Sequence, residues 1–191
     1  PPGAFLYYFV VADYPERRIL GCLSFSAATW HLSDRDQWIG WTKNDREQRL
    51  NQIVNNNRFL VLPWVKVSNL ASHALSLALQ QLRADWQQQH HVKPVLVETF
   101  VDNSRYSGSC YQAANWQCVG ETSGKDWSGE KKQTNNQDGT VKSILMYPLQ
   151  RNFRAILKNE SVTHSNAEID EQFLSLWGRI VTLISTVCAD Y

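Results

Sequence analysis

The sequence predicts one α/β domain in which helices flank a mixed β-sheet, with a helical appendage at its C-terminal end. Short aromatic and β-branched runs alternate with segments whose apolar residues recur at helical spacing. The chain has 191 residues, 43% of them hydrophobic, which is enough for one domain with its own core. A polar stretch precedes a last amphipathic segment. We therefore expect a domain over 1–157, a linker over 158–167 and a helix over 168–191.

The first half of the chain predicts a hairpin, a short helix and a strand. Residues 30–42 carry three Trp residues and predict irregular structure, and the pair Asn44 and Glu47 resembles a capping box. Pro63 inside an apolar run indicates a bulge or a sheet edge. The predicted elements are strands over 4–12 and 19–26, a helix from 44 to about 56, and a strand over 59–65.

The second half predicts the remaining sheet and its covering helices. A long helix is expected from Ser68 or Asn69 to about residue 89, because Leu75, Leu79, Leu82 and Trp86 recur at helical spacing. A loop rich in Gly, Ser, Lys and Asn separates the last two strands. The further elements are strands over 94–101, 117–122 and 141–147, and helices over 107–115 and 149–157.

Composition excludes several classes of protein. The four cysteines form no C-x-x-C pair and the histidines show no matching spacing, so we expect no metal site and reduced thiols of the cytoplasm. No apolar window is long enough to span a bilayer, so no membrane is expected. The net charge of +1 leaves nucleic acid open as a partner, because a basic stripe can lie within a neutral total.

The last segment predicts an interface. Its apolar residues, among them Phe173, Leu176, Trp177 and Ile184, would cover a wide helix face. Such a face is buried, either against a downstream region or against a second copy of the chain, which makes a homo-oligomer one expectation. Because the chain starts without Met and stops within this pattern, we expect it to be a piece of a longer protein.

Several long motifs carry a resemblance to a known family. They are Arg35 to Trp41, Arg58 to Val65, Ser68 to Leu75, Glu98 to Asp102 and Gly108 to Trp116. Over about residues 15–150 the chain resembles the domain of DruA proteins from Druantia anti-phage systems, which also occurs beside transposase-like regions. The resemblance implies a role in phage defence or transposition, with DNA and other defence or transposon proteins as partners.

A more distant resemblance is to the Mom-type DNA-modifying enzymes of phages. Asn69 and Ser72 match a helix start, Asp102 matches a strand end, and Tyr111 with Asn115 matches a Gly-x-x-Tyr-x-Ala-x-Asn helix. Mom-type enzymes are similar to the N-acetyltransferase (GNAT) superfamily, which implies a GNAT-like sheet and an acyl donor such as acetyl-CoA. The turn at residues 66–72 departs from that superfamily because it lacks glycine.

The matched residues suggest roles beside structural alternatives. Asp102 would orient or deprotonate an amine, Tyr111 would protonate a leaving group, and Ser72 would hold the donor with Asn69 and Lys66. The alternatives are an Asx turn or cap at Asp102, a core aromatic at Tyr111, and helix caps at Ser72 and Asn69.

Basic and aromatic residues suggest a surface for nucleic acid. Arg35, Trp38 and Trp41 could hold phosphates and stack bases, and Arg58 and Lys125 could contact phosphates, whereas packed Trp residues and solvated cations are the alternatives. Glu98, inside an apolar strand, needs a partner such as Arg58 or acts as a base.

Two functions therefore stay open. One is a Mom-like group transferase acting on a nucleobase amine. The other is a catalytically inactive GNAT-like module that binds DNA within a defence or transposition complex.

Overall fold

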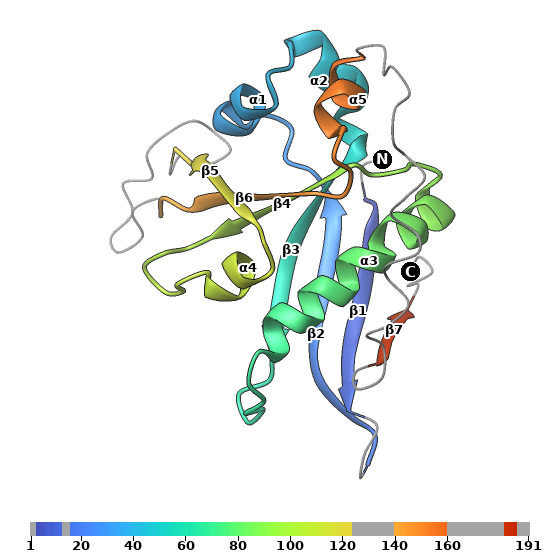
Figure 1. Cartoon of the computed structure of the whole chain (residues 1–191), viewed down its shortest axis with the longest axis vertical. Helices are drawn as coiled ribbons and strands as arrows, with labels where there is room; N and C mark the ends of the chain where they lie inside the picture. Colours follow the sequence, from blue (N-terminus) through green and yellow to red (C-terminus); the bar gives the residue numbers. More distant parts are fainter. Residues whose placement is uncertain (1–2, 13–15, 124–139, 160–181, 187–191) are drawn as a thin grey trace.

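A computed structural model describes residues 3–12, 16–123, 140–159 and 182–186. They form a seven-stranded mixed sheet, which confirms the predicted fold class (Figure 1). The strands are β1 (Phe5–Ala12), β2 (Arg18–Ala27), β3 (Ile53–Val61), β4 (Leu96–Val101), β5 (Gln117–Glu121), β6 (Ser143–Pro148) and β7 (Thr182–Thr186). The helices are α1 (Ser33–Ile39), α2 (Lys43–Arg49), the 3-10 turn η1 (Leu50–Gln52), α3 (Leu70–His90), α4 (Ser109–Ala113) and α5 (Phe153–Lys158).

The sheet has the order β5-β6-β4-β3-β2-β1-β7. Strands β3 and β4 are parallel and are joined through α3, while every other neighbouring pair is antiparallel. A parallel pair needs such a crossover, which the long helix provides. The sheet therefore consists of two antiparallel parts, β7-β1-β2-β3 and β4-β6-β5, which join at the parallel β3–β4 pair.

Two apolar clusters cover the two faces of the sheet. On one face, α3 and α4 pack on alternate residues of the strands, with Val97 and Val101 of β4 pointing into that cluster. On the other face, α1, η1 and α5 pack over Leu96 of β4 and Ile144 of β6, and α2 lies against η1 and α5. In Figure 1, α1, α2 and α5 gather at one end of the molecule, away from α4. Because β4 is covered on both faces, its side chains are almost all buried.

Four predictions about local structure are corrected. Residues 30–42 contain helix α1 rather than only irregular chain, and the capping box of α2 is formed by Thr42 and Asp45 rather than by Asn44 and Glu47. Strand β3 begins at Ile53, six residues before the predicted start at 59, and the predicted helix to 56 ends within η1 at Gln52.

The predicted C-terminal helix does not form where the structure describes it. Residues 182–186 are strand β7, which pairs antiparallel with β1 from Tyr7↔Thr186 to Val11↔Thr182. The remainder of the predicted helix, and most of the predicted linker over 158–167, lie outside the described residues. Within the described part of the chain, no helix is long and apolar enough to cross a membrane.

Candidate functional site

The parallel pair at the centre of the sheet is short. Strands β3 and β4 pair over three positions only, from Ile53↔Leu96 to Asn55↔Glu98. Beyond that point β3 continues to Val61 beside β2, and the two strands diverge (Figure 1). Asn56 and Thr99 stand where the pairing ends, and the Thr99 hydroxyl donates to the Asn56 carbonyl at 2.8 Å.

Asn56 is the centre of a buried hydrogen-bond network. Its side chain is buried, its Nδ2 donates to the carbonyls of Ser24 and Arg58 at 3.0 and 3.1 Å, and its Oδ1 accepts from the Tyr111 hydroxyl at 2.8 Å. The β2–β3 register shifts beside it, which leaves Asn57 as an extra residue of a bulge. The Ser24 hydroxyl donates to Asn57 Oδ1 at 2.6 Å. The end of the parallel pair is thus a polar, fully bonded point.

Tyr111 reaches this point from the face covered by α4. Gly108, with φ of 67°, precedes the helix in the left-handed conformation, and the Tyr111 ring makes edge contacts with Phe59 and Trp116. Burial raises the pKa of Tyr111 to about 12, with the hydrogen bond to Thr99 opposing the rise. The phenol is therefore neutral at pH 7 and serves as a hydrogen-bond donor.

The start of α3 follows β3 after a short exposed loop. Asn69 stands at the N-cap with φ of 59°, its side chain caps nothing, and the first turn has no acidic residue. The Ser72 hydroxyl donates back to the Asn69 carbonyl at 3.1 Å, and Lys66 is exposed in the preceding loop. Asn69 adopts the backbone conformation that glycine usually supplies, so a turn without glycine still forms here. A helix end without an acidic residue favours an anion.

Asp102 follows the last residue of β4 and forms an Asx turn. It accepts from the Ser104 amide at 3.0 Å and from the Ser104 hydroxyl, and Arg105 lies 3.7 Å away. The hydrogen bond from the Ser104 hydroxyl holds the pKa of Asp102 below its ordinary value. The carboxylate is therefore ionised at neutral pH, where it can orient a cation or an amine.

Two residues predicted to contact nucleic acid are buried. The Arg35 guanidinium is fully enclosed and donates to Glu98 at 2.9 Å and to the Thr29 carbonyl at 2.7 Å. Trp41 is buried as well, with the Arg35 guanidinium 5.7 Å from its ring centre. Neither side chain presents a surface to a phosphate or a base, so both stabilise the packing of α1 on the sheet.

Glu98 therefore has a different partner from the one suggested by the sequence. It pairs with Arg35 rather than with Arg58, and it also accepts from the Thr29 amide at 2.7 Å. Burial raises the pKa of Glu98, and the Arg35 guanidinium opposes that rise. Asp36 extends the network by bonding both Arg35 and Arg46.

The other predicted nucleic-acid residues are spread over the molecule. Trp38 is half-buried, with its ring stacked on Phe153 and Arg154 lying over it at 4.5 Å. Arg58 is exposed on β3. No hydrogen bond or ring contact within the described residues joins Trp38 to Arg58, and Lys125 lies outside that part of the chain.

The residues missed by the sequence analysis are Asn56 and Thr99. The only signal was the run Asn55-Asn56-Asn57 before an apolar stretch. Consecutive Asn residues are rare in strand interiors, so such a run is consistent with a bulge.

Among the described residues, no group of three or more His, Cys, Asp or Glu side chains is placed to hold a metal ion.

A family model described as Druantia protein DruA matches residues 1–130. Comparison with curated proteins gives no match.

Among solved structures, the spermidine N-acetyltransferase from Vibrio cholerae in complex with CoA and spermine is 9% identical, with a TM-score of 0.46 over 74% of this chain and 64% of that one. The ribosomal-protein-S5-alanine acetyltransferase from Vibrio fischeri is 14% identical, with a TM-score of 0.45 over 76% and 63%. A mosquito arylalkylamine N-acetyltransferase like 5b is 13% identical, with a TM-score of 0.42 over 73% of each chain. The chain spans less than two thirds of the first two proteins.

Proposed function

The chain belongs to the DruA family of Druantia proteins, and we propose that it is a group transferase of phage defence that acts on an amine of a nucleobase. The observation that carries this proposal is the separation of β3 from β4 beside the start of α3. Past Asn56, β3 has no strand partner on its β4 side within the described sheet. A strand edge of this kind accepts an extended, amide-bearing chain through backbone hydrogen bonds.

The start of α3 suits the anionic end of such a donor. Asn69 and Ser72 stand at a helix terminus that has no side-chain cap, and Lys66 adds a positive charge nearby. These features fit an acyl donor of the acetyl-CoA class, with its amide-bearing arm along β3 and its phosphates at the helix. When bound, such a donor supplies an activated carbonyl carbon.

Two residues of the chain would act on the reacting groups. The amine nitrogen forms a bond to the carbonyl carbon, the bond to the leaving sulfur breaks, and the amine proton passes to water. Asp102, ionised at neutral pH, would accept a hydrogen bond from the amine and orient it. Tyr111, a neutral phenol, would exchange its bond to Asn56 for one to the leaving group.

Donor binding can be tested by calorimetric titration of the protein with CoA and acetyl-CoA. In a Ser72→Glu variant the added carboxylate suits the helix terminus but repels the donor phosphates, so binding should weaken at least tenfold. Gln80→Glu, an exposed position further along the same helix, carries the same charge change and should bind as the native chain does. Failure of the native chain to bind either compound would overturn the acyl-donor assignment.

The transfer itself can be tested by nucleoside mass spectrometry on DNA from cells that express the protein. We expect a modified nucleoside in cells with the native chain and its loss in a Tyr111→Phe variant, which keeps the aromatic ring. The mass difference would identify the transferred group. Unchanged nucleosides in the native strain would contradict a nucleobase as acceptor.

One observation favours a second candidate, a DNA-binding module without catalysis. The Tyr111 hydroxyl and the Asp102 carboxylate both have partners within the chain already, namely Asn56 and Ser104. This candidate predicts a DNA association constant whose logarithm falls linearly with the logarithm of the salt concentration. It also predicts that no chemical product forms. Arg58→Gln would lower that salt slope if Arg58 contacts a phosphate.

A further inference from the structure

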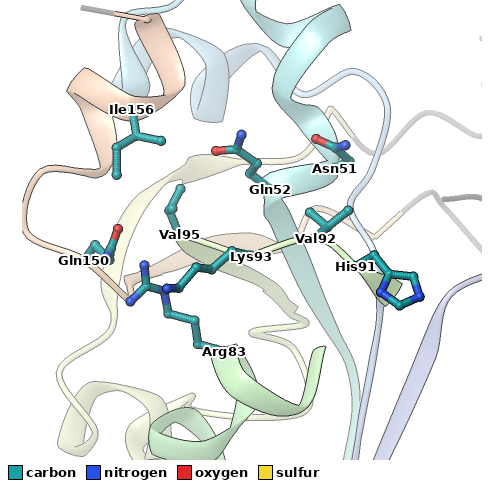
Figure 2. Close-up of a pocket in the computed structure, with 9 residues that line it drawn as sticks. All are labelled: Asn51, Gln52, Arg83, His91, Val92, Lys93, Val95, Gln150 and Ile156. Carbon is teal, nitrogen blue, oxygen red and sulfur yellow. The ribbon is translucent and has the colours of Figure 1, made fainter. Parts of the chain in front are cut away.

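A pocket of about 420 Å³ lies at the other end of β4 from Asp102 (Figure 2). Arg83 comes from α3, Gln52 from η1, Lys93 and Val95 from the chain entering β4, and Gln150 from the chain after β6. Backbone bonds hold these segments together, because the Val95 amide donates to Gln52 and the Leu149 amide donates to Val95, both at 2.9 Å. The pocket is thus a built part of the fold and is separate from the candidate site.

The charge of this pocket has one sign. Arg83, Lys93 and His91 line it, and none of its described lining residues is acidic. No ion pair within the described residues includes Arg83 or Lys93. In Figure 2 the Arg83 side chain rises from α3 toward Lys93 and Gln150, while Gln52 and Ile156 stand opposite. Two cations that share a concave site without an anion favour a negatively charged ligand.

Two buried polar atoms of the pocket have no hydrogen-bond partner. These are Nε of Arg83, a donor, and Oε1 of Gln52, an acceptor. Burial also lowers the pKa of Arg83, which reflects the same loss of water around the guanidinium. Buried polar atoms in proteins are nearly always bonded, so these two atoms leave the polar lining of the pocket with hydrogen-bonding capacity that the described residues do not use.

The remaining lining describes the rest of that ligand. Carboxamides of Asn51, Gln52 and Gln150 offer donors and acceptors, and Val95 and Ile156 add apolar surface. The volume lies within the range of about 300–1,000 Å³ that is usual for small-molecule sites. A phosphate suits Arg83 and Lys93, and a base suits a wall of carboxamides and aliphatic side chains. We propose that this pocket binds a nucleoside 5′-phosphate, free or at the end of a nucleic-acid strand.

Calorimetric titration of the whole chain with AMP, adenosine, inorganic phosphate and a 5′-phosphorylated oligonucleotide tests this proposal. We expect AMP to bind at least tenfold more tightly than adenosine or phosphate. An oligonucleotide that binds more tightly than AMP would identify a strand end as the natural source, and the reverse order would identify free nucleotide. Equal binding of AMP and phosphate, or no binding of AMP and of the oligonucleotide, would overturn the proposal.

Two variants assign the binding to this pocket. Arg83→Gln and Lys93→Gln should each weaken AMP binding at least tenfold, and Arg17→Gln, an exposed arginine of the β1–β2 hairpin, should leave it unchanged. Lys93 is exposed, so its variant separates loss of the ligand from loss of folding, which a thermal melt checks. Unchanged AMP binding in the Lys93→Gln variant would place the nucleotide elsewhere. Ser72→Glu should not affect AMP binding, which distinguishes this site from the proposed donor site.

Discussion

The Tyr111 hydroxyl donates to Asn56 Oδ1 at 2.8 Å across 55 residues of sequence. This bond ties α4 to the point where β3 and β4 stop pairing. It also leaves Asn56 with every polar atom of its side chain bonded. Any ligand that draws the Tyr111 hydroxyl away must therefore offer Asn56 a replacement, or accept the cost of an unpaired buried oxygen.

Tyr111→Phe should lower the free energy of unfolding by about 1–2 kcal/mol, because Asn56 Oδ1 is then buried without a donor. Urea unfolding at pH 7 measures the change. Cys22→Ser, at a half-buried position of β2, serves as a control that changes one side-chain atom without removing a bond of this polar network. A Tyr111→Phe variant as stable as the native chain would show that the bond to Asn56 adds nothing to folding.

The stability difference between the native chain and Tyr111→Phe should fall with rising pH in the alkaline range. The pKa of Tyr111 is raised to about 12 from its ordinary value of 10.0. A raised folded-state pKa stabilises the fold fully below pH 10, and this contribution is lost as the pH rises toward 12. Urea unfolding at pH 9, 10 and 11 tests this expectation. Parallel pH profiles for the two proteins would contradict it.

Glu98→Gln should destabilise the protein by about 1.5–3 kcal/mol, because the fully buried Arg35 then loses one of its two carboxylate partners and keeps only Asp36. Glu16→Gln removes a carboxylate from an exposed pair with Arg18 and should change stability little. Thermal melting of both variants beside the native chain gives the comparison. Equal effects would mean that the Arg35–Glu98 pair is no stronger than a surface pair.

Asp45→Ala should lower stability by a few tenths to about 1 kcal/mol, since Asp45 bonds both the amide and the hydroxyl of Thr42 at the start of α2. These bonds, the backbone one first, hold the pKa of Asp45 below its ordinary 3.8. The difference from the native chain should therefore be full above pH 3.8 and be lost as the pH falls through the lower folded value. Asn44→Ala, with one exposed bond to Gln48, should show no such pH dependence.

Gly21→Ala should destabilise the β2–β3 pairing by about 1–3 kcal/mol. A Cβ at Gly21 would fall against the carbonyl oxygen of Leu60, a backbone atom that can move only if the two strands separate. Hydrogen exchange should show faster opening of the amides near Leu60 and Val61, with little change in β6. Unchanged exchange near Leu60 would show that the strands accommodate the methyl group.

Local patterns predicted most of the sheet and its long helix, because periodicity and turn residues report on nearby chain. They could not predict α1, since its buried Arg35 depends on Glu98, 63 residues away. Local patterns also could not predict the start of β3, because Asn55 to Asn57 have low strand propensity. These residues lie in the strand because Asn56 and Asn57 form hydrogen bonds with Ser24, Thr99 and Tyr111. The stretch over 182–186 belongs to a pattern that predicts a helix, whereas its pairing with β1 makes it a strand.

The candidate site shows the same limit. Family resemblance indicated Tyr111 and Asp102 as candidate site residues. The structure places Asp102 directly after β4 and Tyr111 in α4, the helix that follows. The resemblance said nothing of Asn56, whose importance comes from the three segments that meet on it. The predicted nucleic-acid surface does not include Arg35, because the buried carboxylate of Glu98 pairs with its guanidinium inside the protein.

The pairing of β1 with β7 has a consequence for synthesis of the protein. Strand β1 precedes β7 by about 170 residues, so it leaves the ribosome well before its partner does. During translation the outer edge of β1 therefore has no partner, while its apolar residues Leu6, Tyr8 and Val10 already require cover from α3. Exposed strand edges promote association with other chains. Premature termination before β7 would thus yield a product more prone to aggregate than a chain that includes β7.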